Sequence, residues 1–87
     1  MTFHERILLS HEYKEYIVKQ NTKYKFDLPF NPETFLAFLE NKHLLQDPER
    51  LRSRIKNMLI LNEHWFDDID SLADALTEID MIFEEVQ

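Results

Sequence analysis

The side chains best suited to chemistry in this chain are four histidines and a large excess of carboxylates. His4 and His11 are each followed by a glutamate, but they stand seven residues apart, two helical turns, which is too far to chelate one ion together. The metalloprotease spacing HExxH is absent, and no serine has the flanking glycines of a nucleophile elbow. The chain also has no cysteine, which excludes thiolate nucleophiles and cysteine-bound zinc. We therefore expect no enzyme activity, no metal site and no cofactor.

Composition narrows the class of protein further. The 87 residues contain no glycine, which excludes the Gly-rich loops that bind phosphates and dinucleotides. The hydrophobic fraction of 44% is that of a globular chain, and we expect a single domain over residues 1–87. The longest apolar run, from Phe35 to Leu39, is far shorter than the about 20 residues of a membrane span, and the N-terminus has no signal-peptide core. These features predict a cytoplasmic protein with no membrane partner.

The formal net charge of −7 is distributed very unevenly. Residues 1–56 hold all ten lysines and arginines against eight acids, whereas residues 57–87 hold nine acids and no base. The basic charge is itself concentrated, in Arg50, Arg52, Arg54 and Lys56. Two interpretations stay open: the basic and acidic segments attract each other within the fold, or one of them docks a partner.

Two helix starts share one pattern, Asn31-Pro32-Glu33 and Asp47-Pro48-Glu49. Asn31 and Asp47 are expected to cap, because such side chains accept hydrogen bonds from the free N–H groups of the first turn. Proline suits the first helical position and glutamate the positive end of the helix dipole. The first helix should end near Lys42 or His43. The second should bury one face, which consists of Leu51, Ile55, Met58 and Leu59, and the two should form a helical hairpin.

The C-terminal segment has the clearest periodicity, with apolar residues alternately four and three apart. They are Trp65, Ile69, Leu72, Leu76, Ile79, Phe83 and Val86. This spacing predicts one amphipathic helix of a bundle, starting at Asp67 or Asp68 or continuing from the preceding helix, with Leu76 in the core.

The N-terminal third combines two patterns. Residues 3–20 have a helical pattern, but apolar and polar residues alternate over residues 23–30, which predicts an extended segment with one buried face. The backbone of an extended segment needs hydrogen-bond partners. We therefore expect a mainly α bundle of three to four helices with an extended segment at 23–30. The alternative is an α+β fold with a small β-hairpin at about residues 14–30.

The acidic segment suggests the leading functional hypothesis. Carboxylates at helical spacing present a negative stripe that suits a basic, nucleic-acid-binding surface on a target protein. Small inhibitors and antitoxin-like regulators, including phage-encoded ones, work through this physics. The residues expected to bind the partner are Asp67, Asp70, Asp74, Glu78 and Glu85.

Two other functions are consistent with the sequence. A homodimeric adaptor or chaperone-like module would use the apolar stripe of the last helix, with Leu72, Leu76, Ile79 and Phe83 partly exposed in the monomer. A DNA-binding regulator would use the basic helix over residues 48–58, with contacts to phosphates from Arg50, Arg52, Arg54 and Lys56. The net charge of −7 and the acidic final segment argue against direct nucleic-acid binding.

Overall fold

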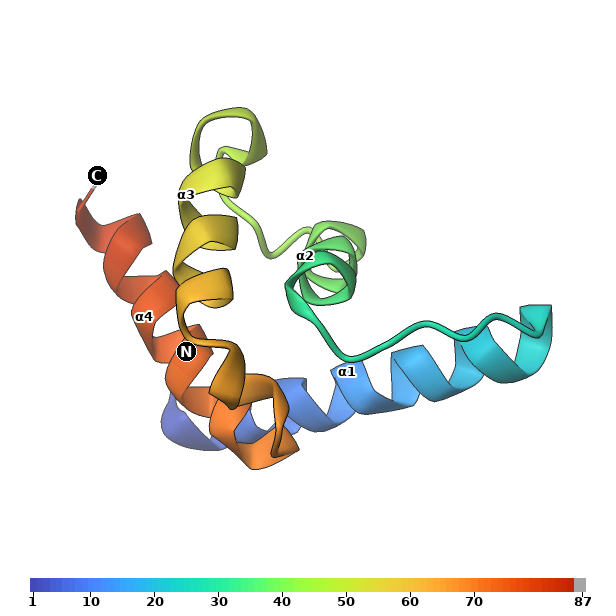
Figure 1. Cartoon of the computed structure of the whole chain (residues 1–87). Coiled ribbons are helices and arrows are strands. Elements are labelled where there is room, and N and C mark those ends of the chain that lie inside the picture. The colour runs from blue at the N-terminus through green and yellow to red at the C-terminus, as the bar shows by residue number, and fades with distance from the viewer. Residues whose placement is uncertain (86–87) are drawn as a thin grey trace.

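The computed structural model describes residues 1–85 and is mainly helical (Figure 1). Its elements are α1 (Phe3–Tyr24), α2 (Pro32–Asn41), α3 (Pro48–Leu61), the 3₁₀ turns η1 (Glu63–Phe66) and η2 (Ile69–Ser71), and α4 (Leu72–Glu85). The mainly α prediction is confirmed. Within residues 1–85 no strand occurs, so the β-hairpin alternative at about residues 14–30 is wrong.

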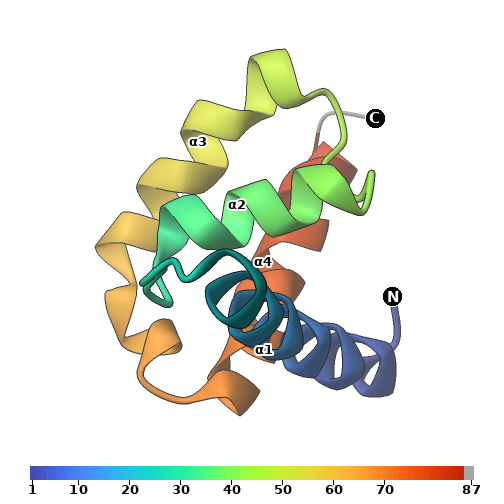
Figure 2. The same cartoon turned by 90° about the vertical axis from the view of Figure 1, so that its right-hand side faces the viewer.

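The helices surround one apolar core, where α4 contacts both α1 and α3. Figure 2 looks roughly along α1, with α4 crossing behind it. Leu76 is 1% exposed, as the periodicity predicted. The other members of the stripe in α4, Leu72, Ile79 and Phe83, are also buried. These are the residues that the adaptor hypothesis required to be partly exposed, and in this fold the chain's own core covers them.

The predicted last helix is divided into three pieces. Trp65 and Ile69 lie in η1 and η2, where they pack half-buried against the core, and α4 begins only at Leu72. The break lies at Asp68, whose backbone is extended and whose carboxylate accepts a hydrogen bond from the N–H of Asp70. Such a side-chain hydrogen bond competes with the helix, because it gives a backbone N–H group a partner while the chain is in a non-helical conformation. Val86 lies outside the described residues.

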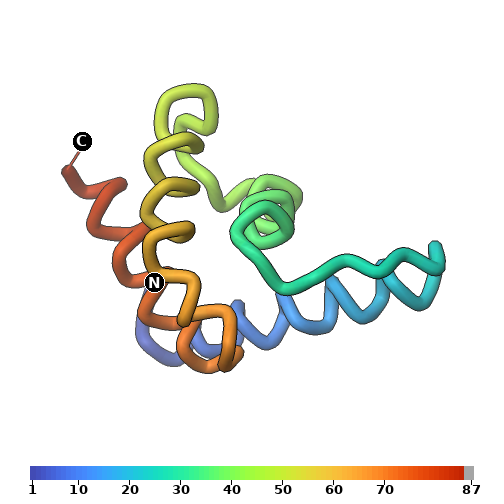
Figure 3. Tube along the Cα trace, viewed as in Figure 1, coloured from blue at the N-terminus to red at the C-terminus, as the bar shows by residue number. Residues whose placement is uncertain are grey.

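The extended segment lies along α1, but it begins two residues later than the alternation suggested (Figure 3). α1 starts with a capping box between Thr2 and Glu5 and continues to Tyr24. The backbone partner of the segment is a side chain, not a strand. The amide of Asn21 accepts a hydrogen bond from the Leu28 N–H at 2.8 Å and donates one to the Leu28 C=O at 3.2 Å. One buried face was predicted, yet Leu28 is its only partly buried member. Phe30 is 37% exposed although its ring lies edge-on to that of Tyr13, with centroids 5.7 Å apart, and Tyr24 and Phe26 are each about half exposed.

The two predicted helix starts have different outcomes. Asn31 caps α2 as expected, since its side chain accepts from the Thr34 N–H, and Pro32 is the first helical residue. Pro48 is likewise the first residue of α3, but the expected cap by Asp47 is wrong, because its side chain makes no capping bond. Its backbone is left-handed, with φ 45° and ψ 61°, whereas a capping side chain works from an extended backbone. The α3 face that was predicted to be buried is confirmed, with Met58 only half-buried.

α2 ends in a C-terminal capping motif that usually contains a glycine, although this chain has none. The N–H of Leu44 bonds the C=O of Leu39, and the N–H of His43 bonds the C=O of Glu40, both at 3.0 Å. This is the Schellman pattern, in which the residue after the cap adopts a left-handed backbone and is usually glycine. Here His43 takes that position, with φ 57°. A residue with a Cβ atom is strained in this conformation.

The replacement His43→Gly is therefore expected to stabilise the protein by about 1 kcal/mol, because it relieves the left-handed strain. Urea denaturation of the variant and the parent measures the effect. The control is His43→Ala, which removes the imidazole but keeps the Cβ atom. Glycine no better than alanine would show that the backbone at this position is not strained.

Candidate functional site on the outward face of α4

The outward side of α4 brings together three of the five predicted docking residues. Asp74, Glu78 and Glu85 are exposed and lie four and seven residues apart, so that they form one line along the helix. Met81 lies in the same line and is 50% exposed. We call these four residues the α4 face. Its N-terminal half, Asp74 and Glu78, has no basic side chain within ion-pair distance among residues 1–85.

The other two predicted residues are not on α4, so the predicted five-residue helical face is wrong in its first part. Asp67 lies exposed between the two 3₁₀ turns, and Asp70 lies in η2. The carboxylate of Asp70 contacts His11 of α1, with Oδ1 2.9 Å from Nε2. Asp70 therefore has a structural partner, whereas Asp74 and Glu78 have no ion pair within the described residues.

All four cations of the predicted basic cluster pair with acids of the same chain. Arg52 Nε donates to Glu40 Oε1 at 2.6 Å, and its Nη2 lies 3.4 Å from Glu33 Oε2. Lys56 also pairs with Glu33, so that α3 is tied to α2 at two places. The remaining pairs are Arg54 with Glu85 of α4 and Arg50 with Asp47 at 3.9 Å. The attraction between the basic and acidic segments that the sequence suggested therefore accounts only for the Arg54 pair, because the other partners are Glu33 and Glu40 of α2 and Asp47.

The pairing perturbs the acid–base behaviour of Glu33. Its pKa is lowered from the usual 4.5, chiefly because the Lys56 ammonium donates a hydrogen bond to the carboxylate, with a further contribution from Arg52. A carboxyl group with a lower pKa in the folded state stabilises the fold above its unfolded pKa. That contribution disappears as the pH falls through the folded pKa.

We therefore expect Glu33→Gln to be less stable than the parent at neutral pH and to lose less stability on acidification below pH 4.5. Urea denaturation at a series of pH values measures this difference. Glu49→Gln is the matched control, because Glu49 is exposed and has no ion pair among residues 1–85. Parallel pH profiles for Glu33→Gln and the parent would contradict the role of the Lys56 pair. Part of the slope persists in both, since the capping box with Thr2 also lowers the pKa of Glu5.

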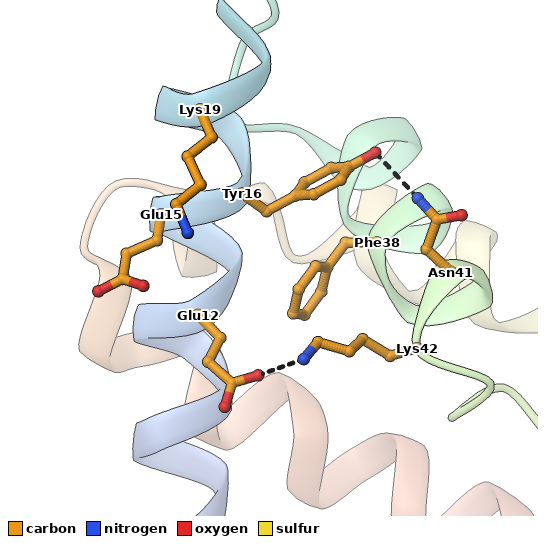
Figure 4. Close-up of a pocket in the computed structure, with 7 residues that line it drawn as sticks. All are labelled: Glu12, Glu15, Tyr16, Lys19, Phe38, Asn41 and Lys42. Carbon is orange, nitrogen blue, oxygen red and sulfur yellow. Dashed lines mark hydrogen bonds and ion pairs between the residues drawn. The ribbon is translucent and has the colours of Figure 1, made fainter. Parts of the chain in front are cut away.

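A further feature, which the sequence did not indicate, is an open groove of about 510 Å³ between α1 and α2 (Figure 4). Its lining residues are Glu12, Glu15, Tyr16, Lys19, Phe38, Asn41 and Lys42. Most of the polar groups in its walls contact each other. Lys42 Nζ is 2.9 Å from Glu12 Oε2, and the Asn41 amide donates to the Tyr16 hydroxyl at 3.2 Å. Nothing in the sequence signals this groove, because its walls come from residues about 25 positions apart.

The residues that could do chemistry are dispersed over the fold. Within residues 1–85, no group of three or more histidine, aspartate or glutamate side chains is arranged to hold a metal ion. No helix in the same part of the chain is long and apolar enough to cross a membrane.

Comparison with known proteins adds no family to this description. No protein-family model matches the chain, and no curated protein or solved structure is significantly similar to it.

Proposed function

We propose that this chain is a small protein-binding regulator that docks its α4 face on a basic surface of a target protein. The observation that carries the proposal is the contrast in pairing. Arg50, Arg52, Arg54 and Lys56 all have carboxylate partners, whereas Asp74 and Glu78 have no basic partner among residues 1–85.

Like charges four residues apart on a helix repel each other, which weakens the helix. A basic partner would remove this repulsion and would also be steered toward the face during its approach. Met81, half exposed among the carboxylates, adds an apolar contact that a docked surface could cover. Methionine suits that role, because its flexible side chain adapts to irregular surfaces.

The target class that fits this face is a protein with a basic groove, such as one that binds nucleic acid. Occupation of that groove by a negative helix would exclude the natural polyanion, which is how a small inhibitor or antitoxin-like regulator acts. Such a regulator needs no cofactor and no catalytic residue, and we place it in the cytoplasm. The phage-encoded inhibitors mentioned above are the nearest functional analogy.

Capture from the native host tests the proposal. The immobilised protein is expected to retain a basic protein, and Asp74→Lys combined with Glu78→Lys is expected to lose it. The matched control, Glu49→Lys with Glu63→Lys, makes the same change in net charge at exposed positions outside α4. Retention of the same protein by all three would show that the α4 face does not bind it.

A further inference from the structure

The second half of α1 projects beyond the core. Ile17 is the last buried residue of the helix, and the chain then continues to Tyr24 and turns back through Lys25. Figures 1 and 3 show this end of α1 extending away from α3 and α4, accompanied only by the extended segment. The molecule is correspondingly long, at 40 × 27 × 23 Å. We call residues 18–26 the arm.

The arm carries three of the four lysines that have no ion pair within residues 1–85. It contains Lys19, Lys23 and Lys25 and no acid. Together with Lys14, these are the lysines and arginines that have no ion pair within residues 1–85. The fold thus neutralises the conspicuous cluster at 50–56 and leaves a different basic surface free.

The arm also exposes an aromatic pair. The rings of Tyr24 and Phe26 stack with centroids 5.4 Å apart and planes 26° apart, and each residue is about half exposed. The Lys23 ammonium lies 5.1 Å from the centre of the Tyr24 ring. Tyr24 follows Ile17 by two helical turns and so continues the buried stripe of α1 past the end of the core. Exposed apolar groups rimmed by charge are typical of an interaction surface.

We propose that the arm of one copy docks on the α4 face of a second copy. The two surfaces are complementary in charge, because the three lysines of the arm and the carboxylates of Asp74 and Glu78 all have no ion pair in the part of the chain that the structure describes. They are also complementary in apolar character, since the Tyr24–Phe26 pair can cover Met81, and sulfur–aromatic contacts are favourable. The arm and α4 lie at opposite ends of the molecule (Figure 1), so the contact requires a second chain. A two-fold arrangement forms it twice.

A nucleic acid is the competing occupant of a basic, aromatic arm. The net charge of −7 disfavours it, because a polyanion would be repelled by the molecule as a whole. Self-association rests on the proposed function, since it uses the same α4 face. It adds regulation to that function, because a dimer covers the face and a target must compete with the second copy for it.

A charge exchange between two variants tests the inference. The arm variant is Lys19→Glu with Lys23→Glu, and the face variant is Asp74→Lys with Glu78→Lys. Each variant alone should be monomeric, because like charges meet in both of its contacts. An equal mixture should form a heterodimer, because opposite charges meet in both contacts again. Sedimentation velocity at low ionic strength measures the association, and circular dichroism verifies that both variants are folded.

The wild-type protein is expected to dimerise, with an association that weakens as salt is added. A monomeric wild type at every accessible concentration, or two folded variants that fail to associate when mixed, would overturn the proposal. The proposal would also be overturned if the wild type were monomeric and bound a single-stranded oligonucleotide that the arm variant does not bind. A milder variant, Lys19→Gln with Lys23→Gln, should weaken dimerisation if the glutamate variant does not fold. The arm variant should still capture the target, so failure of self-association is distinguishable from failure of the proposed function.

Discussion

Leu76→Ala is expected to lower the free energy of unfolding by about 2–5 kcal/mol. Leu76 is 1% exposed in the middle of α4, where it packs among core residues of the other helices. The truncation removes buried methyl groups and leaves a cavity that a small core cannot fill by relaxing. A small domain has a total stability of only about 5–15 kcal/mol, so the loss should be visible as a clearly lower melting temperature.

Met81→Ala is the matched control for this prediction. Met81 is on the same helix and similar in size to Leu76, but it is 50% exposed. Its truncation should cost less than about 1 kcal/mol. Urea denaturation of the three proteins measures the difference. Equal losses from the two truncations would contradict the assignment of Leu76 to the core and of Met81 to the surface.

The features that could be predicted from the sequence are those set by neighbouring residues. The Asn31 cap and Pro32 fix the start of α2 within a few positions, and the apolar spacing identifies the buried faces of α3 and α4. These signals are local, because helical periodicity and capping depend on residues within one or two turns. The mainly α fold follows from them.

The secondary-structure predictions were wrong where a side-chain hydrogen bond to the backbone replaced the regular structure that the apolar spacing indicated. Residues 65–71 have the apolar spacing of a helix, but the Asp68 carboxylate accepts a hydrogen bond from the Asp70 N–H, and the helix is interrupted there. Residues near 23–30 keep the alternation of a strand, but the Asn21 amide provides the backbone partner that a second strand would have supplied. The spacing of apolar residues indicates which side chains are buried, but it does not indicate which polar side chain will hydrogen-bond a backbone group.

The candidate site was predictable only in part for a related reason. The exposed acids Asp74 and Glu78 follow from their place opposite the buried stripe. The ion pairs of the basic cluster could not be predicted from local sequence, because Glu33 is 19 residues from Arg52 in the sequence and lies beside it only in the folded chain. The lack of ion pairs for the lysines of the arm, within residues 1–85, likewise depends on the fold and not on neighbouring residues in the sequence.

Asp74→Lys combined with Glu78→Lys is expected to weaken binding of the target by roughly ten- to a hundred-fold. The double replacement converts an attractive contact into a repulsive one in the N-terminal half of the α4 face. The protein should stay folded, because both residues are exposed and lie opposite the buried stripe of α4. Asp70 is left unchanged, since its contact with His11 helps to hold η2 on α1. A thermal melt beside the binding titration separates lost affinity from lost structure.

The most direct measurement for the central claim is the association rate constant of this variant and the parent with the captured target at two ionic strengths. If the α4 face steers docking, the parent should associate fast at low salt and much more slowly at high salt. The double variant should associate slowly at both and respond little to salt. A folded double variant that associates as fast as the parent at low salt would contradict docking through the α4 face.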